Sequence, residues 1–270
     1  MPPEERRPHC MVFDSGMGGL TVVSELKSQG FSGKISYAAD TGFFPYGDKT
    51  DTELTARIPE LAARLIAIAQ PDIFVIACNT ASTLALDGVR ARTDIPVVGT
   101  VPAIKPAAKL TRTGTIGVLA TPGTLRRSYT DALVHEFARD SLVLSHGSVK
   151  LVELAERTAI GENVSDEELK SELELLFRQV GGDVIDVVVL ACTHFPLLKD
   201  RLSAIAGEGV SFIDSGAAIA RRVMTLLGEV RAEGDAVLDR VYMTGASASA
   251  DRLILATERL GFAGQTTIEV

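Results

Sequence analysis

Short apolar runs that alternate with helical segments constrain this chain more than any other feature. Runs such as DIFVIAC (72–78) and DVVVLAC (186–192) are almost continuous in apolar residues, without the strict alternation of a half-exposed strand. Such runs are typical of parallel strands that helices cover on both faces. Because strands and helices alternate along the chain, the sequence predicts an α/β fold with mainly parallel sheets.

The pattern predicts strands at residues 10–13, 35–38, 73–77, 97–98, 115–119, 142–144, 187–191, 211–213, 241–243 and 266–270. It predicts helices at residues 20–29, 52–69, 83–92, 102–110, 124–138, 149–160, 165–180, 197–206 and 217–227. Ser165 and Glu168 form a capping box at the start of one of these helices. No helix is predicted after residue 227, where the chain carries no usable motif.

A weak internal repeat indicates two related halves. DIFVIACNTAS (72–82) and DVVVLACTHFP (186–196) both place an aspartate and an apolar run before Ala-Cys and polar residues. A glycine-containing turn follows a strand near the start of each half, and Pro102 and Pro106 mark a crossing between the halves. We therefore expect two pseudo-symmetric α/β lobes with the active site in the cleft between them. The N-terminal lobe would hold residues 1–100 and 208–270, and the C-terminal lobe residues 101–207.

Composition and charge exclude several classes of partner. The chain has 270 residues, a formal net charge of −8 and no cluster of Lys or Arg, so neither nucleic acid nor a membrane surface is expected as a partner. Its apolar runs are too short to cross a bilayer, and its N-terminus lacks the apolar core of a secretory signal. We expect a cytoplasmic protein. The three cysteines form no CxxC pair, so neither a metal site nor a disulfide framework is expected.

Cys78 and Cys192 each follow a predicted strand and precede polar residues. Ligands of open α/β sheets bind at this edge, where the start of a helix favours a carboxylate or a thiolate. A buried cysteine usually packs as a small apolar residue, but two cysteines in matching polar motifs favour chemistry. Cys10 lacks such neighbours and is expected in the core. The histidines outside these motifs are expected at the surface or in loops: His9, His135 and His146.

Two thiols that face one another suit the inversion of a stereocentre. One base removes a proton from one face of a carbon, and a conjugate acid returns a proton to the opposite face. A free thiol has a pKa of about 8.5, so modest assistance makes it usable as acid or base near neutral pH. Asp14, at the end of the first predicted strand, and His194, two residues after Cys192, can give that assistance.

Two glycine-containing turns lie at the same predicted edge. DSGMGG (14–19) meets neither the dinucleotide nor the Walker pattern, so it is either a tight strand-to-helix turn or a ligand-binding turn. Asp14 and Ser15 favour the ligand-binding interpretation. TGFFPYGDKT (41–50) is a Pro/Gly turn with aromatic residues, and it follows the second predicted strand.

With these residues assembled, the chain strongly resembles the glutamate racemases of the aspartate/glutamate racemase superfamily. The matching stretches are VFDSGMGGLTV, ADTGFFPYGDKT, VIACNTAS, IPVVGTVPAIKPA, IGVLATPGTL and VLACTHFPLL. The resemblance implies a two-lobed fold and the interconversion of L- and D-glutamate without a cofactor. It also implies that D-glutamate is supplied to peptidoglycan synthesis and thus to the cell wall. Members of the family commonly form dimers, so a homodimer is compatible with the resemblance.

The resemblance also implies residue roles. Cys78 and Cys192 would be the proton donor and acceptor, with Asp14 and His194 as their polarising neighbours. Two further acidic residues would assist catalysis, namely Asp40 and Glu156. The substrate glutamate would be bound by Asp14, Ser15, Pro45, Tyr46, Gly47, Asn79, Thr80, Thr121, Thr124, Thr193 and His194.

Three other functions are open on the residues. A thiol hydrolase or transferase would use Cys192 as nucleophile and His194 as base, and it would leave Cys78 without a role. An amino-acid-binding protein would bind glutamate without exchanging its α-hydrogen. A racemase of aspartate or of a hydantoin would differ only in substrate.

Overall fold

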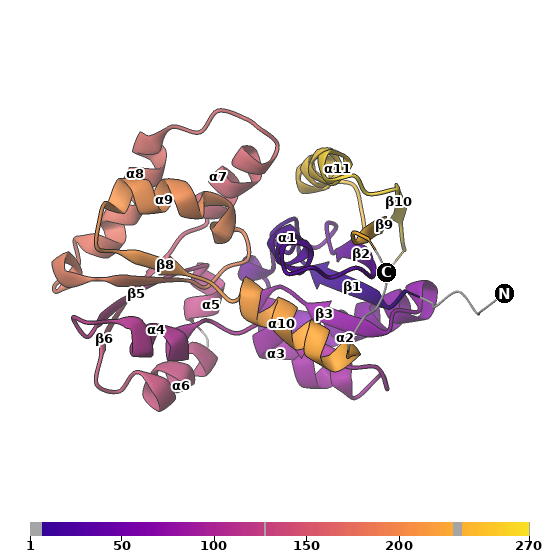
Figure 1. Ribbon diagram of the computed structural model, residues 1–270, viewed down its shortest axis with the longest axis horizontal. Coiled ribbons are helices and arrows are strands. Elements are labelled where there is room, and N and C mark those ends of the chain that lie inside the picture. The colour runs from indigo at the N-terminus through magenta and orange to yellow at the C-terminus, as the bar shows by residue number, and fades with distance from the viewer. Residues whose placement is uncertain (1–6, 127, 229–233, 270) are drawn as a thin grey trace. The chain divides into compact units, whose positions relative to one another are not determined.

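The computed structural model of the chain describes residues 7–126, 128–228 and 234–269. It contains two compact units, one formed by Met1–Thr100 with Gly216–Val270 and the other by Val101–Ser215. Each unit is built on one sheet, and every pair of neighbouring strands in both sheets is parallel (Figure 1). The predicted α/β class with mainly parallel sheets is therefore confirmed.

The sheet of the first unit has the strand order β10-β9-β2-β1-β3-β4. Its strands are β1 (His9–Asp14), β2 (Lys34–Ala39), β3 (Ile73–Ile76), β4 (Val97–Gly99), β9 (Val237–Met243) and β10 (Gly264–Thr267). Its helices are α1 (Leu20–Ser28), η1 (Tyr46–Asp48), α2 (Asp51–Ala69), α3 (Asn79–Arg90), α10 (Gly216–Leu227) and α11 (Ala248–Leu260). All residues of β1 and β3 are buried, because helix pairs such as α2 with α3 and α1 with α10 pack together around the sheet.

The sheet of the second unit has the strand order β6-β5-β7-β8. Its strands are β5 (Thr115–Ala120), β6 (Leu142–Gly147), β7 (Val187–Leu190) and β8 (Ser211–Ile213). Its helices are α4 (Ile104–Leu110), α5 (Pro122–Leu125), α6 (Ser128–Phe137), α7 (Lys150–Ala159), α8 (Asp166–Phe177), η2 (Gly182–Val184), η3 (Phe195–Leu198) and α9 (Lys199–Ala206). The sequence-based boundary after residue 207 assigned β8 to the first lobe, but β8 pairs with β7 and belongs to this unit.

The internal repeat is visible in both sheets. The order β2-β1-β3-β4 of the first unit matches the order β6-β5-β7-β8 of the second. The aspartate that begins each repeated stretch accepts hydrogen bonds in the same way. Before β3, Asp72 accepts a hydrogen bond of 2.7 Å from the backbone N–H of His9. Before β7, Asp186 accepts bonds of 2.6 Å from the Thr111 hydroxyl and 2.7 Å from the Arg112 N–H. Each carboxylate thus ties its strand to the segment that leads into the central strand.

The C-terminal helix α11 was absent from the predicted elements. Its start and end are nevertheless well formed, since the Ser247 side chain accepts a hydrogen bond from the N–H of Ala250 and Gly261 closes the helix at φ 92°. Its buried residues follow helical spacing: Ser249, Ala250, Leu253, Ala256 and Thr257. Four of the five are small or polar, so an apolar periodicity barely registers in the sequence. The predicted helix at 124–138 is also different, because it is divided into α5 and α6.

His9 was expected at the surface, but it begins β1 and is buried. Its Nε2 atom lies 2.8 Å from Ser36 Oγ, and that hydroxyl donates to Asp239 Oδ2 at 3.1 Å. Burial lowers the pKa of His9, and the positive charge of Lys34 lowers it further, while Asp239 and Asp72 oppose the shift. The folded protein therefore favours the neutral imidazole.

This burial makes a prediction about acid stability. Below pH 6.5 the unfolded chain binds a proton at His9 that the folded chain resists, so the free energy of unfolding falls as pH decreases. The slope contributed by one such group is at most about 1.4 kcal/mol per pH unit. Urea unfolding at pH 7.5 and 5.0 measures it, with His9→Gln as the test variant and the exposed His135→Gln as its control. If His9→Gln keeps the full pH dependence of the wild type, another group causes the acid sensitivity.

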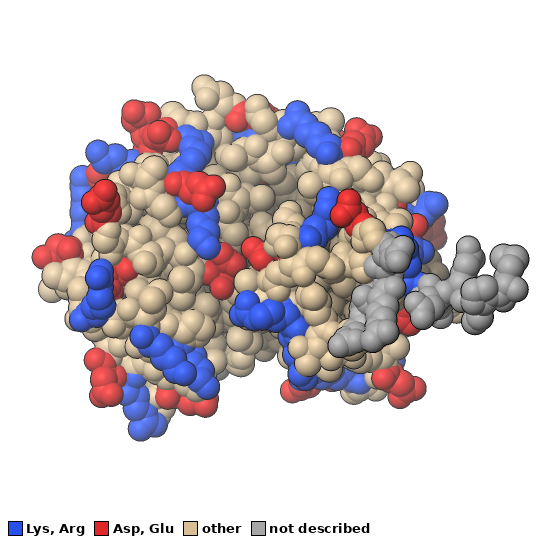
Figure 2. Space-filling view, viewed as in Figure 1, with Lys and Arg blue, Asp and Glu red and all other residues tan. Residues whose placement is uncertain are grey.

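The surface shows charges of both signs. Lys and Arg side chains are interspersed with Asp and Glu over the face drawn in Figure 2. Within the described residues, no helix combines the length and the apolar character needed to cross a membrane.

Candidate active site

Each sheet has one point at which neighbouring connections run in opposite directions. In the first unit β1 lies between β2 and β3, and in the second unit β5 lies between β6 and β7. Ligands of open α/β sheets bind outside the carboxyl ends of the strands at such points. In the first unit Asp14 ends β1 and Cys78 follows β3, while in the second unit Thr121 follows β5 and Cys192 follows β7. Both cysteine motifs therefore lie at ligand-binding edges.

Cys78 is the first link in a series of polar groups. It is the N-cap residue of α3 and is 7% exposed. Its thiol contacts Ser15 Oγ at 3.9 Å, and the Ser15 hydroxyl donates to Asp14 Oδ1 at 3.1 Å. The N–H of Gly16 also donates to that oxygen, at 3.3 Å. A buried carboxylate is thus connected to the thiol through one hydroxyl.

The DSGMGG turn owes its shape to close packing. A Cβ atom at Gly19 would lie 3.0 Å from the Cβ atoms of Asp14 and Ala77 and 3.0 Å from the Tyr37 hydroxyl, so a side chain there would displace the turn. The Tyr37 hydroxyl donates to the carbonyl of Gly16 at 2.6 Å. The turn is tight because it is pressed against β1 and β2, and this packing keeps Ser15 beside Cys78.

Two polar residues follow Cys78 in the first turn of α3. Asn79 and Thr80 are both buried. The Oδ1 atom of Asn79 is buried and, within the described structure, has no hydrogen-bond partner. Buried acceptors normally have a partner, so this oxygen is suited to a donor on a ligand, such as an ammonium group.

Cys192 has a different pair of neighbours. Its Sγ atom lies 3.9 Å from His194 Nδ1, and His194 Nε2 lies 3.5 Å from Glu156 Oε1. The second distance is at the outer limit of a hydrogen bond, so the attraction is mainly electrostatic and depends on a protonated imidazole. All three side chains are buried. Together they form a thiol–imidazole–carboxylate series.

The helix that carries Glu156 is fixed by its neighbour in the sequence. The Arg157 side chain donates to the carbonyl of Asn163 at 2.8 Å, and to carboxylates of Glu162 and Glu168 at 3.2 Å each. These bonds join the second half of α7 to the loop and helix that follow it. Glu156 is consequently held on the buried face of a well-anchored helix.

The predicted threonines of the second unit lie at the same edge as Cys192. Thr121 caps α5, and its hydroxyl lies 3.0 Å from that of Thr124. Thr193 follows Cys192 directly and is buried. The predicted residues of this half thus form two groups of contacts, one of Thr121 with Thr124 and one of Cys192 with His194 and Glu156.

The segment after β2 contains the other predicted binding residues. Tyr46 begins η1 and is buried, with the less buried Pro45 and Gly47 on either side of it. Its hydroxyl donates to Asp40 Oδ2 at 2.7 Å. Burial raises the pKa of Tyr46 well above its usual value, and the negative charge of Asp40 raises it further. The phenol therefore keeps its proton, and Tyr46 and Cys78 belong to the same buried cluster.

Two residues of this region were missed by the sequence analysis. Arg57, on α2, and Thr244, after β9, both donate to the Asp40 carboxylate. Arg57 lies on a helix face without a recognisable motif, and Thr244 lies in the part of the chain for which no motif was found. A favourable pairing between an arginine and an aspartate 17 positions away leaves no local signal in the sequence.

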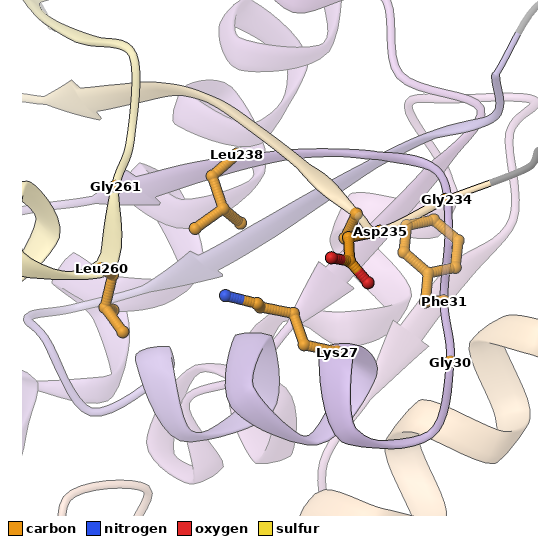
Figure 3. Close-up of a pocket in the computed structure, with 9 residues that line it drawn as sticks. Lys27, Gly30, Phe31, Gly234, Asp235, Leu238, Leu260 and Gly261 are labelled. Atoms are coloured by element: carbon orange, nitrogen blue, oxygen red, sulfur yellow. The ribbon is translucent and has the colours of Figure 1, made fainter.

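A cavity of about 400 Å³ lies elsewhere in the first unit. Figure 3 shows the side chains of Lys27, from α1, and Asp235, before β9, directed into it. Its other lining residues lie before β2, before or at the start of β9, or at the end of α11, so the cavity is at the amino ends of the strands. None of the predicted site residues lines it. Within the described ranges, no group of three or more His, Cys, Asp and Glu side chains could hold a metal ion.

Comparisons with known proteins show the family of this chain. The profile of the Asp/Glu/Hydantoin racemase family matches residues 28–223. Glutamate racemase of Sphingopyxis alaskensis is 52% identical over 225 residues, which are 83% of this chain and 84% of that protein. Glutamate racemase of Vibrio cholerae is 43% identical over 255 residues, 94% of each chain.

A solved structure is similar over almost its full length. Escherichia coli glutamate racemase, in complex with L-glutamate and the activator UDP-MurNAc-ala, superposes with a TM-score of 0.89 at 40% identity. The match covers 98% of this chain and 99% of that one. With a family profile that spans most of the chain and close relatives along nearly all of it, this protein belongs to the Asp/Glu/Hydantoin racemase family and is an amino-acid racemase.

Proposed function

We propose that this protein is a cofactor-independent glutamate racemase that moves a proton between Cys78, Cys192 and the α-carbon of glutamate. One observation carries the proposal: each unit places a thiol after the strand next to its central strand and gives it a separate series of polar neighbours. Cys78 has Ser15 and Asp14, and Cys192 has His194 and Glu156.

In the proposed reaction, one cysteine acts as a thiolate and removes the α-proton, so that its sulfur gains the hydrogen and the carbon gains an electron pair. The other cysteine, as a thiol, gives its proton to the opposite face of that carbon and becomes the thiolate. Asp14 and His194 assist these transfers by stabilising the proton-bound or charged forms of their neighbours. Reaction in the opposite direction uses the same two sulfurs with their roles exchanged.

The substrate groups match the remaining side chains by chemistry. The Asn79 Oδ1 atom would accept a hydrogen bond from the α-ammonium group. Helix-start N–H groups of α3 and the hydroxyls at the strand ends of each unit would bind the carboxylates. These hydroxyls belong to Ser15, Thr80, Thr121, Thr124 and Thr193. The buried position of both thiols limits access of bulk water, which strengthens such interactions.

Glutamate is favoured over aspartate or a hydantoin because the similar proteins described above are glutamate racemases, and one was solved with L-glutamate. On this proposal the D-glutamate formed supplies peptidoglycan synthesis. A thiol hydrolase is the second candidate, since a Cys192–His194–Glu156 series also suits a nucleophilic cysteine. The separate polar series at Cys78 has no use in that reaction, which weighs against the hydrolase.

The decisive measurement needs only the purified protein. Incubated in deuterium oxide with L-glutamate and no added cofactor, it is expected to reduce the optical rotation to zero while deuterium appears at the α-carbon. L-aspartate in a parallel reaction tests the choice of substrate. If rotation and α-hydrogen of L-glutamate both stay unchanged, the proposal is wrong. Deuterium at the α-carbon of aspartate alone would assign the protein to a different substrate.

A further inference from the structure

We propose that Arg57 and Thr244 are positioning residues that hold Tyr46 and Gly47 in place through Asp40. We call the four side chains of Asp40, Tyr46, Arg57 and Thr244 the Asp40 clamp. The inference rests on the proposed function, in which Tyr46 and Gly47 bind glutamate. It assigns roles to two residues that have no motif in the sequence.

The Asp40 carboxylate is fully buried and receives four hydrogen bonds. Its Oδ1 atom accepts from Arg57 Nη2 at 2.8 Å and from the Thr244 hydroxyl at 2.6 Å. Its Oδ2 atom accepts from Arg57 Nε at 2.7 Å and from the Tyr46 hydroxyl at 2.7 Å. Two acceptor sites on each oxygen are thereby occupied. Asp40 has no remaining acceptor site for a substrate proton, so its role is to position other groups.

The positive charge of Arg57 offsets the desolvation cost of burying the Asp40 carboxylate. Hydrogen bonds to Asp40 raise the pKa of Arg57, so the guanidinium keeps its positive charge beside the Asp40 side chain. The guanidinium also lies over the ring of Phe43, with 4.8 Å between its Cζ atom and the ring centroid. The Phe43 ring in turn meets Tyr46 edge-on, at 6.4 Å between centroids. Arg57 therefore contacts the segment before Tyr46 on two sides.

Thr244 connects the clamp to the C-terminal part of the chain. Besides donating to Asp40, its hydroxyl accepts a bond of 3.0 Å from the N–H of Gly42. The Thr41 hydroxyl donates to the carbonyl of Gly245 at 2.7 Å, and Ser247 donates to the carbonyl of Thr41 at 3.2 Å. Residues 244–247 thus hold residues 41–42 by several bonds, just before the segment that carries Tyr46.

The clamp determines what Tyr46 can offer to a ligand. The phenolic proton is directed to Asp40, and Tyr46 belongs to the same buried cluster as Cys78. Tyr46 can therefore contact a ligand through the lone pairs of its phenol but not by donating its hydroxyl proton. Such contacts are made equally to the bound substrate and to the transition state. A misplaced segment should therefore raise KM and leave kcat nearly unchanged.

The test compares Thr244→Val, which removes the hydroxyl at similar volume, with Thr244→Ser, which keeps it. We expect KM for L-glutamate to rise about tenfold in Thr244→Val, as for the loss of one hydrogen bond to a charged group, with kcat within threefold of the wild type. We expect Thr244→Ser to restore the wild-type KM. Thr266→Val, on β10 and bonded to the exposed Arg240, is the matched control and should change neither constant.

A second measurement needs no substrate. Amide hydrogen exchange of residues 41–48 should be about tenfold faster in Thr244→Val than in the wild type or in Thr266→Val. If the wild type racemises glutamate but Thr244→Val changes neither KM nor exchange, the clamp is refuted and the function stands. If exchange rises but the wild type does not racemise glutamate, the clamp stands and the function is refuted. Should Thr244→Val fail to fold, Arg57→Lys, which keeps the charge but loses the two-pronged contact, is measured in the same way.

Discussion

Replacing either Cys78 or Cys192 by serine is expected to lower kcat for glutamate racemisation by about 10³-fold. General acid–base catalysis by one positioned group contributes about 10²–10⁴-fold, and a serine hydroxyl is far too weak an acid to exchange protons at the rate of a thiol. Polarimetry on each variant measures the loss. The two variants should be similarly impaired, because inversion needs both a base and an acid on every turnover.

Solvent exchange separates this mechanism from its rival. With one thiol left, each serine variant should still exchange the α-hydrogen for deuterium in one enantiomer of glutamate, without inverting it. Cys78→Ser and Cys192→Ser should select opposite enantiomers. Cys10→Ala is the control, since burial in the core raises the pKa of that thiol strongly and keeps it out of the chemistry. Full activity in Cys78→Ser would instead favour the hydrolase.

Replacing the polar neighbour of either thiol is also expected to lower kcat strongly. We expect Asp14→Asn and His194→Asn each to lower kcat about 10²-fold, because each removes the group that assists one sulfur. The two enantiomers of glutamate have equal free energies, so kcat/KM must stay equal in both directions for any variant. The two variants therefore cannot be told apart by kcat/KM. They should differ in whether proton removal from L-glutamate or from D-glutamate has become slow.

Substrates that carry deuterium at the α-carbon reveal that step. The kinetic isotope effect should increase for one enantiomer in Asp14→Asn and for the other in His194→Asn. Asp235→Asn and His135→Asn change the same residue types at exposed positions and should leave rates and isotope effects unchanged. If Asp14→Asn and His194→Asn increase the isotope effect for the same enantiomer, the pairing of Asp14 with Cys78 and His194 with Cys192 is wrong.

The parts of the fold that the sequence predicts well are those with local signals. The strands β3 and β7 are apolar runs between polar residues, and parallel pairing then requires their carboxyl ends to lie at one edge of a sheet. Cys78 and Cys192 could be located from this alone, since each follows such a run. The site residues near them follow in sequence, so a motif could identify most of them.

The remaining features depend on contacts between distant residues. Thr244 and Asp40 are 204 positions apart, and no local pattern relates them. His9 was misplaced because a histidine at the start of a strand is buried only when partners such as Ser36 and Asp239 surround it. The boundary near residue 208 was wrong for a similar reason, because the pairing of β8 with β7 is tertiary information.

The return of residues 216–270 to the first sheet has a consequence for synthesis on the ribosome. When residues 1–215 have been made, every strand of the second sheet is present, while the first sheet still lacks β9 and β10. Until then β2 is an open edge, and Asp40 lacks the hydroxyl of Thr244. The nascent chain therefore completes the proposed substrate-binding segment only after β9, Thr244 and β10 have been translated, so we expect activity to begin after that point.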